Sequence, residues 1–272
     1  MEREFFDIEL NGVCMRVAAM RRHGWLTPIV FLHGFGSTKE DYADVARYKQ
    51  FDGRPIIAFD APGFGETECA DLSVLSIPFL QQTVENVLDR CGVQRFHLVG
   101  HSMGGLTALM YAHDHRHAPL SFINIEGNVA PEDCFLSRQI VDYPSNTAAE
   151  FLARLIERIG RTPGFSHPLY AANLPAKVHC EAVAPIFRSM VELSDNDELL
   201  SKFIGLPFAR MFVYGDENRS LSYLDTLKDH GVELAEIADS GHFPMYANPP
   251  ALWARISDFI ERSEKVRQHD RA

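Results

Sequence analysis

Six short apolar runs recur along the chain, and most of them contain no alternating polar residues. They occupy residues 29–32, 56–59, 96–99, 122–125, 211–214 and 232–237. Strands that are covered on both faces of a sheet have this pattern, because neither set of side chains meets solvent. Segments with helical apolar spacing separate several runs; one ends at Gly92 and another follows Pro249 and Pro250. This alternation predicts an α/β fold with a mostly parallel sheet and helices on both faces.

The first twenty residues contain two further strand-like runs, at 5–10 and 13–20, separated by Asn11 and Gly12. This dipeptide tolerates the positive φ angles of a two-residue turn, so we expect the chain to open with a β-hairpin. Together with the six later runs, the hairpin predicts an eight-stranded sheet. Ser37 followed by Glu40 is typical of a capping box and predicts the start of a helix.

The alternation of strands and helices stops between the sixth and seventh runs. Residues 127–207 contain two amphipathic helical patterns, one beginning at a Thr147–Glu150 capping box and one passing through Ile186, and prolines such as Pro168 and Pro175 punctuate them. We therefore expect a core formed by residues 1–126 and 208–272. Residues 127–207 are expected to form a helical cap over the carboxyl edge of the sheet.

Composition excludes several classes of function. The 272 residues include 26 Lys and Arg against 37 Asp and Glu, a formal net charge of −11, which argues against a nucleic-acid partner because phosphate binding relies on clustered cations. The five cysteines are scattered and lack a C-x-x-C spacing, which indicates free thiols, no structural metal and a reducing, cytoplasmic location. The sequence contains no apolar run long enough to span a membrane.

The strongest chemical signal is a G-x-S-x-G motif that extends from Gly100 to Gly104. It directly follows a predicted strand and precedes a helical segment, which is the context that a nucleophile elbow requires. Glycines permit the sharp turn, and the turn exposes the hydroxyl of Ser102. The helix that begins there directs free N–H groups and the positive end of its dipole at the place where an oxyanion would form.

With this motif the sequence resembles the α/β-hydrolase superfamily, and the resemblance extends over nearly the whole chain outside residues 127–207. The segments His33-Gly34-Phe35-Gly36 and Asp60-Ala61-Pro62-Gly63-Phe64-Gly65 are similar to the oxyanion loop and to the turn after the fourth strand of that family. The resemblance implies the α/β-hydrolase fold and an oxyanion hole formed by the backbone N–H groups of Phe35 and Met103. A phosphate-binding loop is disfavoured, because the third glycine of G-x-G-x-x-G is missing.

A serine nucleophile needs a base within hydrogen-bond reach, and His242 is the candidate. It lies just beyond the last predicted strand and before the final helix, as the histidine of the family does. The alternative is that His242 only packs within a loop. A metal site formed by His113, His115 and His117 is disfavoured, because alternating positions do not share one face of a helix.

The third member of the predicted triad has two candidates. In most of the family the acid lies three residues beyond the glycine that ends the seventh strand, and that count from Gly215 reaches Asn218, an amide. Asp216 lies on the same loop, whereas Glu126 ends the sixth strand, where some relatives place the acid. We prefer Glu126, because a charge at the end of an apolar strand is costly without a partner such as protonated His242. The alternative is that Glu126 only caps a loop or forms a structural ion pair with an arginine.

These residues predict a serine hydrolase that acts on a carboxylic ester, thioester or related small acyl substrate without a cofactor or metal. A carbon–carbon bond hydrolase or acyltransferase with the same triad, or a slow ligand-binding or signalling protein, is the alternative. The serine disfavours dehalogenase and epoxide hydrolase chemistry, since relatives with those activities use an aspartate there. We expect the cap to supply an apolar pocket wall through Phe135, Phe151, Phe165 and Phe187.

Overall fold

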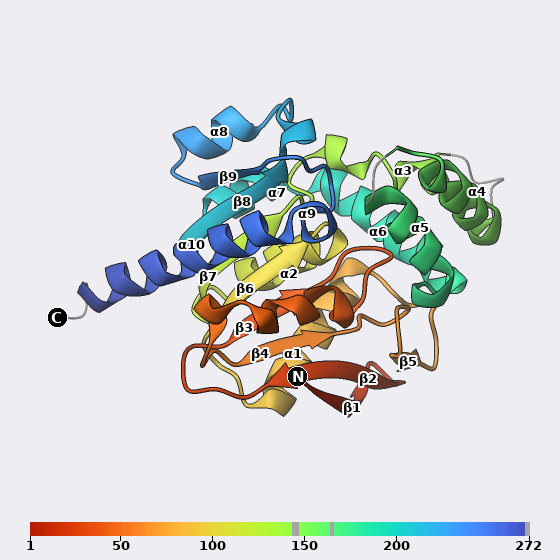
Figure 1. The fold of residues 1–272 in the computed structure, drawn as a ribbon. Coiled ribbons are helices and arrows are strands. Elements are labelled where there is room, and N and C mark those ends of the chain that lie inside the picture. Colours follow the sequence, from red (N-terminus) through yellow and green to blue (C-terminus); the bar gives the residue numbers. More distant parts are fainter. Residues whose placement is uncertain (143–146, 164–165, 270–272) are drawn as a thin grey trace.

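A computed structural model describes residues 1–142, 147–163 and 166–269. Its sheet follows the strand order β1-β2-β4-β3-β6-β7-β8-β9 (Figure 1). The strands on this path are β1 (Glu2–Leu10), β2 (Val13–Arg22), β3 (Ile29–Leu32), β4 (Ile56–Phe59), β6 (Phe96–His101), β7 (Pro119–Ile125), β8 (Ala209–Gly215) and β9 (Glu233–Ile237). The six strands from β4 to β9 on this path are parallel, while β1 and β2 are antiparallel to their neighbours. The predicted α/β fold with a mostly parallel eight-stranded path is confirmed.

Two local features differ from, or add to, the predicted strands. Asn11 and Gly12 have φ angles of 53° and 81°, and they join β1 and β2 as the predicted hairpin turn. A short ninth strand, β5 (Glu68–Cys69), was not predicted; it pairs with Met15 and Arg16 of β2. Two residues are too few for apolar periodicity to indicate a strand.

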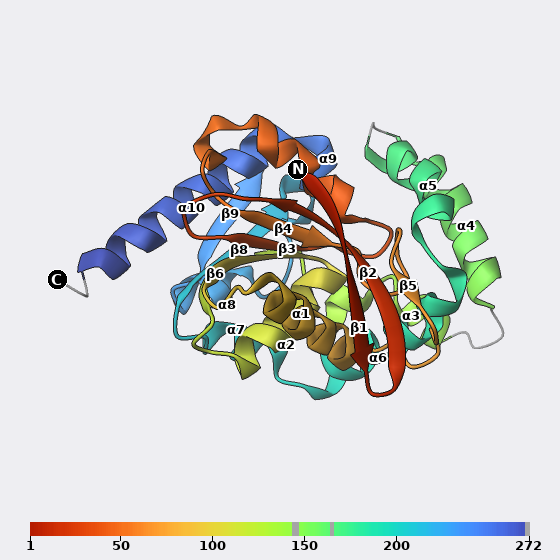
Figure 2. The ribbon, with the colours of Figure 1, turned by 90° about the horizontal axis from the view of Figure 1, so that it is seen from below.

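Two layers of helices cover the sheet (Figure 2). One layer contains α1 (Ile77–Cys91), α2 (Met103–Asp114), α7 (Leu199–Ile204) and α8 (Leu224–Asp229). The other contains the 3-10 helices η1 (Lys39–Arg47) and η2 (Lys49–Phe51) and the helices α9 (Pro244–Ala247) and α10 (Pro249–His269). Strand residues alternate between the two layers: Val30 and Leu32 face the first, and Ile29 and Phe31 face the second. Both faces are apolar, which is why the strand runs lack polar alternation.

The helices between β7 and β8 lie beyond one end of the sheet (Figures 1 and 2). They are η3 (Pro131–Cys134), α3 (Arg138–Val141), α4 (Ala148–Gly160), α5 (Ser166–Lys177) and α6 (Cys180–Asn196), with α7 following; a short η4 (Asp216–Asn218) follows β8. In the described residues, every helix is too short or too polar to cross a membrane.

The strand order reverses next to β3. The chain passes from β3 to β4 on one side and then crosses to β6 on the other side of β3. At such a switch point the loops that leave neighbouring strands diverge, and a crevice opens at their carboxyl ends. The loop after β3 carries Phe35, and the turn after β6 carries Ser102, so two predicted site residues meet at this point.

Candidate active site

Ser102 occupies a strained turn between β6 and α2. Its φ and ψ are 51° and −120°, a conformation that a residue other than glycine adopts only when the surrounding structure enforces it. Its backbone N–H donates to the carbonyl of Ile125 at 3.0 Å. The turn needs glycine beside it, because a Cβ on Gly104 would lie 2.3 Å from the carbonyl oxygen of Leu32. Tight packing of α2 against β3 therefore produces the elbow that the motif predicts.

The loop after β3 lies directly beside this serine. A Cβ on Gly34 would lie 3.0 Å from the Cβ of Ser102. Met103 is the first residue of α2, so its N–H belongs to the helix turn that lacks partners within the helix. Phe35 and Ser102 both line one cavity. The two backbone groups predicted for the oxyanion hole thus flank the serine on the β3 and α2 sides.

His33 holds the peptide plane that precedes Phe35. Its Nε2 accepts a hydrogen bond from the N–H of Ala61 at 2.9 Å, so the proton is on Nδ1, which donates to the carbonyl of Gly34 at 2.8 Å. The N–H of Ser37 also donates to this carbonyl. Because N–H and C=O point in opposite directions across a trans peptide, this arrangement turns the N–H of Phe35 away from His33. Burial lowers the pKa of His33 and keeps the ring neutral.

Glu126 and His242 are in direct contact. The Nδ1 atom of His242 lies 2.8 Å from Oε2 of Glu126, which is 8% exposed at the end of β7. Burial alone would raise the pKa of the Glu126 carboxyl. Hydrogen bonding and charge interaction with His242, together with hydrogen bonds from Asn218 and Gly215, outweigh burial and lower that pKa, so the group stays ionised.

Asn218, the residue reached by the family count, holds the Glu126 carboxylate. Its side-chain amide donates to Oε1 and Oε2 at 2.9 and 2.8 Å, and the N–H of Gly215 donates to Oε1 at 2.8 Å. Asp216, the alternative acid, instead accepts a hydrogen bond from the N–H of Ser240 at 3.0 Å. The structure therefore brings Glu126, and not Asp216, to the imidazole of His242.

His101, the variable residue before the serine, supports the loop that carries His242. Its Nε2 donates to the carbonyl of His242 at 2.8 Å, and the two rings lie 4.9 Å apart. Its Nδ1 is buried and has no hydrogen-bond partner in the described part of the chain. Burial, assisted by the neighbouring His242, lowers the pKa of His101 to about 3. Sequence analysis missed this role, because the motif places no restriction on the residue before serine.

Ser102 and His242 open into a cavity of about 360 Å³, within the size range of small-molecule sites. Phe135 and Phe187 line it as predicted, whereas Phe151 is buried behind Phe187, with ring centroids 5.7 Å apart. Phe165 lies outside the described residues. Most of the wall comes from the segment between β7 and β8, and its apolar members include Leu136, Leu155, Ile159 and Met190.

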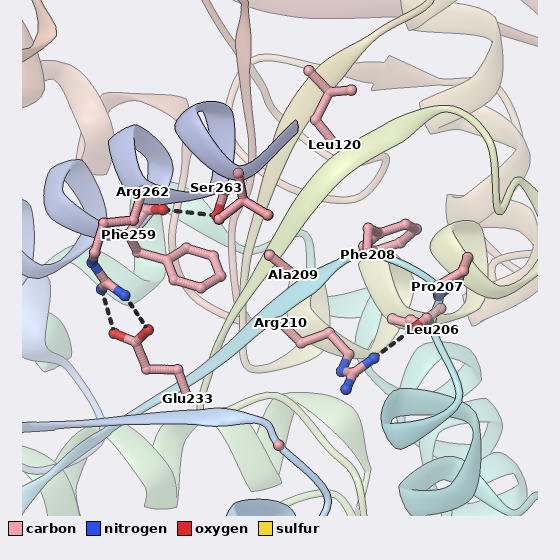
Figure 3. Close-up of a pocket in the computed structure, with 12 residues that line it drawn as sticks. Leu120, Leu206, Pro207, Phe208, Ala209, Arg210, Glu233, Phe259, Arg262 and Ser263 are labelled. Atoms are coloured by element: carbon pink, nitrogen blue, oxygen red, sulfur yellow. Dashed lines mark hydrogen bonds and ion pairs between the residues drawn. The ribbon is translucent and has the colours of Figure 1, made fainter. Parts of the chain in front are cut away.

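A larger hollow of about 680 Å³ lies at the amino ends of β7 and β8 (Figure 3). There Glu233 faces Arg262 in an ion pair, and the hydroxyl of Ser263 donates to the carbonyl of Phe259 at 2.7 Å. Arg210 donates to the carbonyl of Leu206. Glu233 and Arg262 pair with each other, whereas Nε of Arg210 is buried without a hydrogen-bond partner in the described residues. The hollow lies at the amino ends of the strands, and ligands of open α/β sheets bind at the carboxyl ends. The smaller cavity at Ser102 is therefore the candidate active site.

Comparison with known proteins gives the same architecture. The chain is 24% identical over 254 residues to the 2-succinyl-6-hydroxy-2,4-cyclohexadiene-1-carboxylate synthase of Yersinia pseudotuberculosis, covering 89% of this chain and 90% of the relative. A carboxylesterase structure from Nitrososphaera gargenis superposes with a TM-score of 0.77 at 14% identity, covering 96% of this chain and 99% of the other. An esterase from Thermogutta terrifontis gives 0.71 at 19% identity, with 97% and 99% covered.

At these identities the superpositions establish a shared fold. The sequence model of the family matches residues 29–256. This range includes the elbow at Ser102, the loop after β3 and the loop that carries His242. The chain belongs to the alpha/beta hydrolase family.

Proposed function

We propose that the protein is a serine hydrolase that cleaves a carboxylic ester, thioester or related acyl substrate through an acyl-enzyme intermediate. The observation that carries this proposal is the 2.8 Å contact between His242 and the ionised Glu126, in a site where His242 and Ser102 line one cavity. A carboxylate on Nδ1 fixes the tautomer that leaves Nε2 free to accept a proton. An imidazole in this state can activate a serine hydroxyl.

In the proposed acylation step, the Oγ of Ser102 bonds to the carbonyl carbon while its proton passes to Nε2 of His242. The N–H groups of Phe35 and Met103 stabilise the resulting oxyanion. His242 then returns the proton to the leaving alcohol or thiol as the carbonyl–oxygen or carbonyl–sulfur bond breaks. Water attacks the acyl-enzyme in the same way, which releases the acid and restores the hydroxyl of Ser102.

Residues 127–207 are proposed to act as the cap of this site and to select the substrate. Their contribution to the wall is mostly apolar, which favours an acyl or alcohol group with a hydrocarbon part. Among the polar groups of the wall, the hydroxyl of Tyr170 and the carboxylate of Asp133 are already hydrogen-bonded to protein atoms. No cofactor is needed for the proposed steps.

Labelling with a fluorophosphonate tests the nucleophile. Native protein should gain one adduct, located at Ser102 by peptide mass analysis, and Ser102→Ala should gain none. Ser137→Ala is the matched control, because Ser137 lines the same cavity and its hydroxyl donates to the carbonyl of Cys134. An unreactive native protein, or an adduct at another residue, would refute the activated serine. Turnover of p-nitrophenyl butyrate beyond one equivalent then separates an enzyme from a slow receptor.

A second candidate is the activity of the Yersinia relatives. The match to them extends over 89% of this chain and 90% of the relative. Labelling of Ser102 with no repeated turnover of esters, together with formation of 2-succinyl-6-hydroxy-2,4-cyclohexadiene-1-carboxylate by the protein, would favour this candidate over the ester hydrolase.

A further inference from the structure

Tyr170 connects the inserted helices to the loop that carries Phe35. It belongs to α5, and its hydroxyl donates to the carbonyl of Phe35, 135 residues earlier in the chain, at 2.7 Å. Tyr170 is 2% exposed, and its ring lies against that of Phe243, with centroids 4.3 Å apart. Phe243 directly follows His242. One side chain from α5 therefore contacts both the loop after β3 and the loop of the proposed base.

The fit around the Tyr170 hydroxyl is close. A Cβ on Gly36 would lie 2.4 Å from this oxygen, and Gly36 itself has a φ of +71°. The glycine thus permits both the turn of the loop and the approach of the tyrosine. Burial, with the charge of Asp41 nearby, raises the pKa of Tyr170 far above its usual value. The hydroxyl therefore stays protonated and remains a hydrogen-bond donor at neutral pH.

Two peptide planes meet at Phe35, and each is held from a different part of the molecule. The plane that contains the Phe35 N–H is held on the core side, where His33 and Ser37 donate to the Gly34 carbonyl. The next plane is held on the side of α5, by Tyr170. Because the two planes are joined only through the φ and ψ angles of Phe35, holding the second plane restrains the first, and with it the direction of the Phe35 N–H. An oxyanion donor is effective only when it is oriented before the reaction.

The end of α5 is also fixed to the core. The ammonium of Lys177 lies 2.7 and 3.0 Å from the two carboxylate oxygens of Asp41. The N–H of Gly65 donates to the carbonyl of Lys177, and Val178 forms a β-bridge with Phe64. These contacts hold α5 where the Tyr170 hydroxyl reaches the loop.

We propose that Tyr170 is a positioning residue that couples the seating of α5 to the geometry of the oxyanion hole, so that the hole is complete only when the inserted helices are docked. This inference rests on the proposed function, because it assigns Tyr170 a part in stabilising the oxyanion formed at Ser102. It extends that function by giving the inserted segment a role in the rate of reaction in addition to substrate selection.

Tyr170→Phe removes one hydroxyl and keeps the ring against Phe243. With p-nitrophenyl butyrate we expect kcat to fall about 10- to 100-fold, below the range for deleting a donor itself, with KM changed less than about twofold. A trifluoromethyl ketone, which forms an oxyanion on the serine, should bind more weakly by the same factor as kcat/KM. Butyrate, the product, should bind as it does to the native protein.

Tyr111→Phe is the matched control, because Tyr111 is a buried tyrosine on α2 whose ring stacks on that of His115, with centroids 4.4 Å apart, away from the residues that line the cavity. It should retain native kcat and ketone affinity. Lys177→Met provides a second test, because it removes the ion pair with Asp41 that holds the end of α5. It should lower kcat and ketone affinity about 3- to 10-fold with little effect on KM.

Native kcat in Tyr170→Phe would overturn the inference. Equal weakening of the ketone and butyrate would also overturn it, since general loosening of the cavity affects both ligands. Failure of the proposed function can be told apart from failure of this inference, because in that case fluorophosphonate would not label Ser102 in the native protein. Labelling that is normal in amount but slower in Tyr170→Phe supports both proposals.

Discussion

Glu126, the proposed acid, contacts Asn218, which lies three residues after Gly215, where the family resemblance implies a single acidic residue. Glu126 reaches His242 from the end of β7, and Asn218 donates to both of its oxygens from the loop after β8. An aspartate at 218 would place a second negative charge against Glu126, whereas the amide supplies two N–H groups. Asn218 cannot act as the acid, because its side chain is an amide. The same amide can donate hydrogen bonds to a carboxylate on the neighbouring strand.

Glu126→Gln should reduce kcat for p-nitrophenyl butyrate by about 10³- to 10⁴-fold at neutral pH, because an amide cannot stabilise the imidazolium that forms on His242. Asp216→Asn is the comparison, and it should keep kcat within about threefold, since Asp216 accepts a hydrogen bond from Ser240. Steady-state kinetics on both variants, with folding checked by circular dichroism, measures the difference. The opposite ranking would transfer the acid role to Asp216.

Because His101 stays neutral in the folded protein, the free energy of unfolding depends on pH. Its pKa is lowered to about 3 in the folded protein, whereas an unfolded histidine takes up a proton near its ordinary value of 6.5. Between these values the unfolded chain binds more protons, so this contribution to stability is complete above pH 6.5 and declines as the pH falls toward 3. Protonation within the fold would place a hydrogen on Nδ1, which is buried and unpartnered in the described residues.

His101→Gln retains an N–H donor for the carbonyl of His242 and removes the titration. The free energy of unfolding of the native protein should fall between about pH 7.5 and about pH 5, and in the variant this fall should be smaller by about 2 kcal/mol. Urea unfolding at the two pH values measures the difference. His117→Gln, at an exposed position, should behave as the native protein does. An unchanged pH dependence in His101→Gln would show that the buried ring is protonated in the fold.

At the scale of elements, the predictions that rest on residues close together in the sequence agree with the structure. The covered strands, the hairpin turn, and the helices that end at Gly92 and begin at Thr147 are present, because each depends on neighbours in sequence. The reciprocal bonds of the Thr147–Glu150 capping box measure 3.0 and 3.2 Å.

Elements whose limits depend on tertiary contacts were predicted less accurately. The cap before η1 is formed by Thr38 and Asp41, not by Ser37 and Glu40: the Thr38 N–H donates to Asp41 at 3.0 Å, and the same aspartate pairs with Lys177 of α5. In the inserted segment the prolines predict interruptions between helices, yet α5 includes Pro175. A proline at this position removes one backbone hydrogen bond of the helix, and α5 packs against α4 along its length.

The same division applies to the candidate site. Ser102 and His242 carry local signals, namely an elbow motif and a position after the last strand. Tyr170 carries none, and the count from Gly215 identifies Asn218 but not its partner, because the contacts of Tyr170 with Phe35 and of Asn218 with Glu126 span 135 and 92 residues. An amide or a phenol becomes informative only when its partner is known, and the partner is determined by which strands are neighbours in the sheet.

At the scale of the whole molecule, the candidate site and a polar cluster occupy opposite ends of the sheet. Near the starts of β4 and β6, Arg54 donates to both carboxylate oxygens of Glu264 on α10, at 2.9 and 2.7 Å, and Nε2 of His97 lies 3.2 Å from one of them. Although burial opposes ionisation, hydrogen bonds and charge interactions with Arg54 and His97 hold the pKa of Glu264 far below its usual value. Its stabilising contribution is present above the ordinary glutamate pKa and is lost as the pH falls through the lowered value.

This separation allows stability and activity to be changed independently. Glu264→Gln should lower the free energy of unfolding by about 2 kcal/mol at neutral pH, because it leaves the charge of Arg54 buried without its carboxylate. Urea unfolding measures this loss, and Glu261→Gln, at an exposed position on the same helix, should stay within about 0.5 kcal/mol of the native protein. Under conditions in which Glu264→Gln remains folded, fluorophosphonate should label its Ser102 at the native rate. A slower reaction in the folded variant would mean that α10 transmits strain through the sheet to the elbow, and the two ends of the molecule would then have to be treated as one coupled unit.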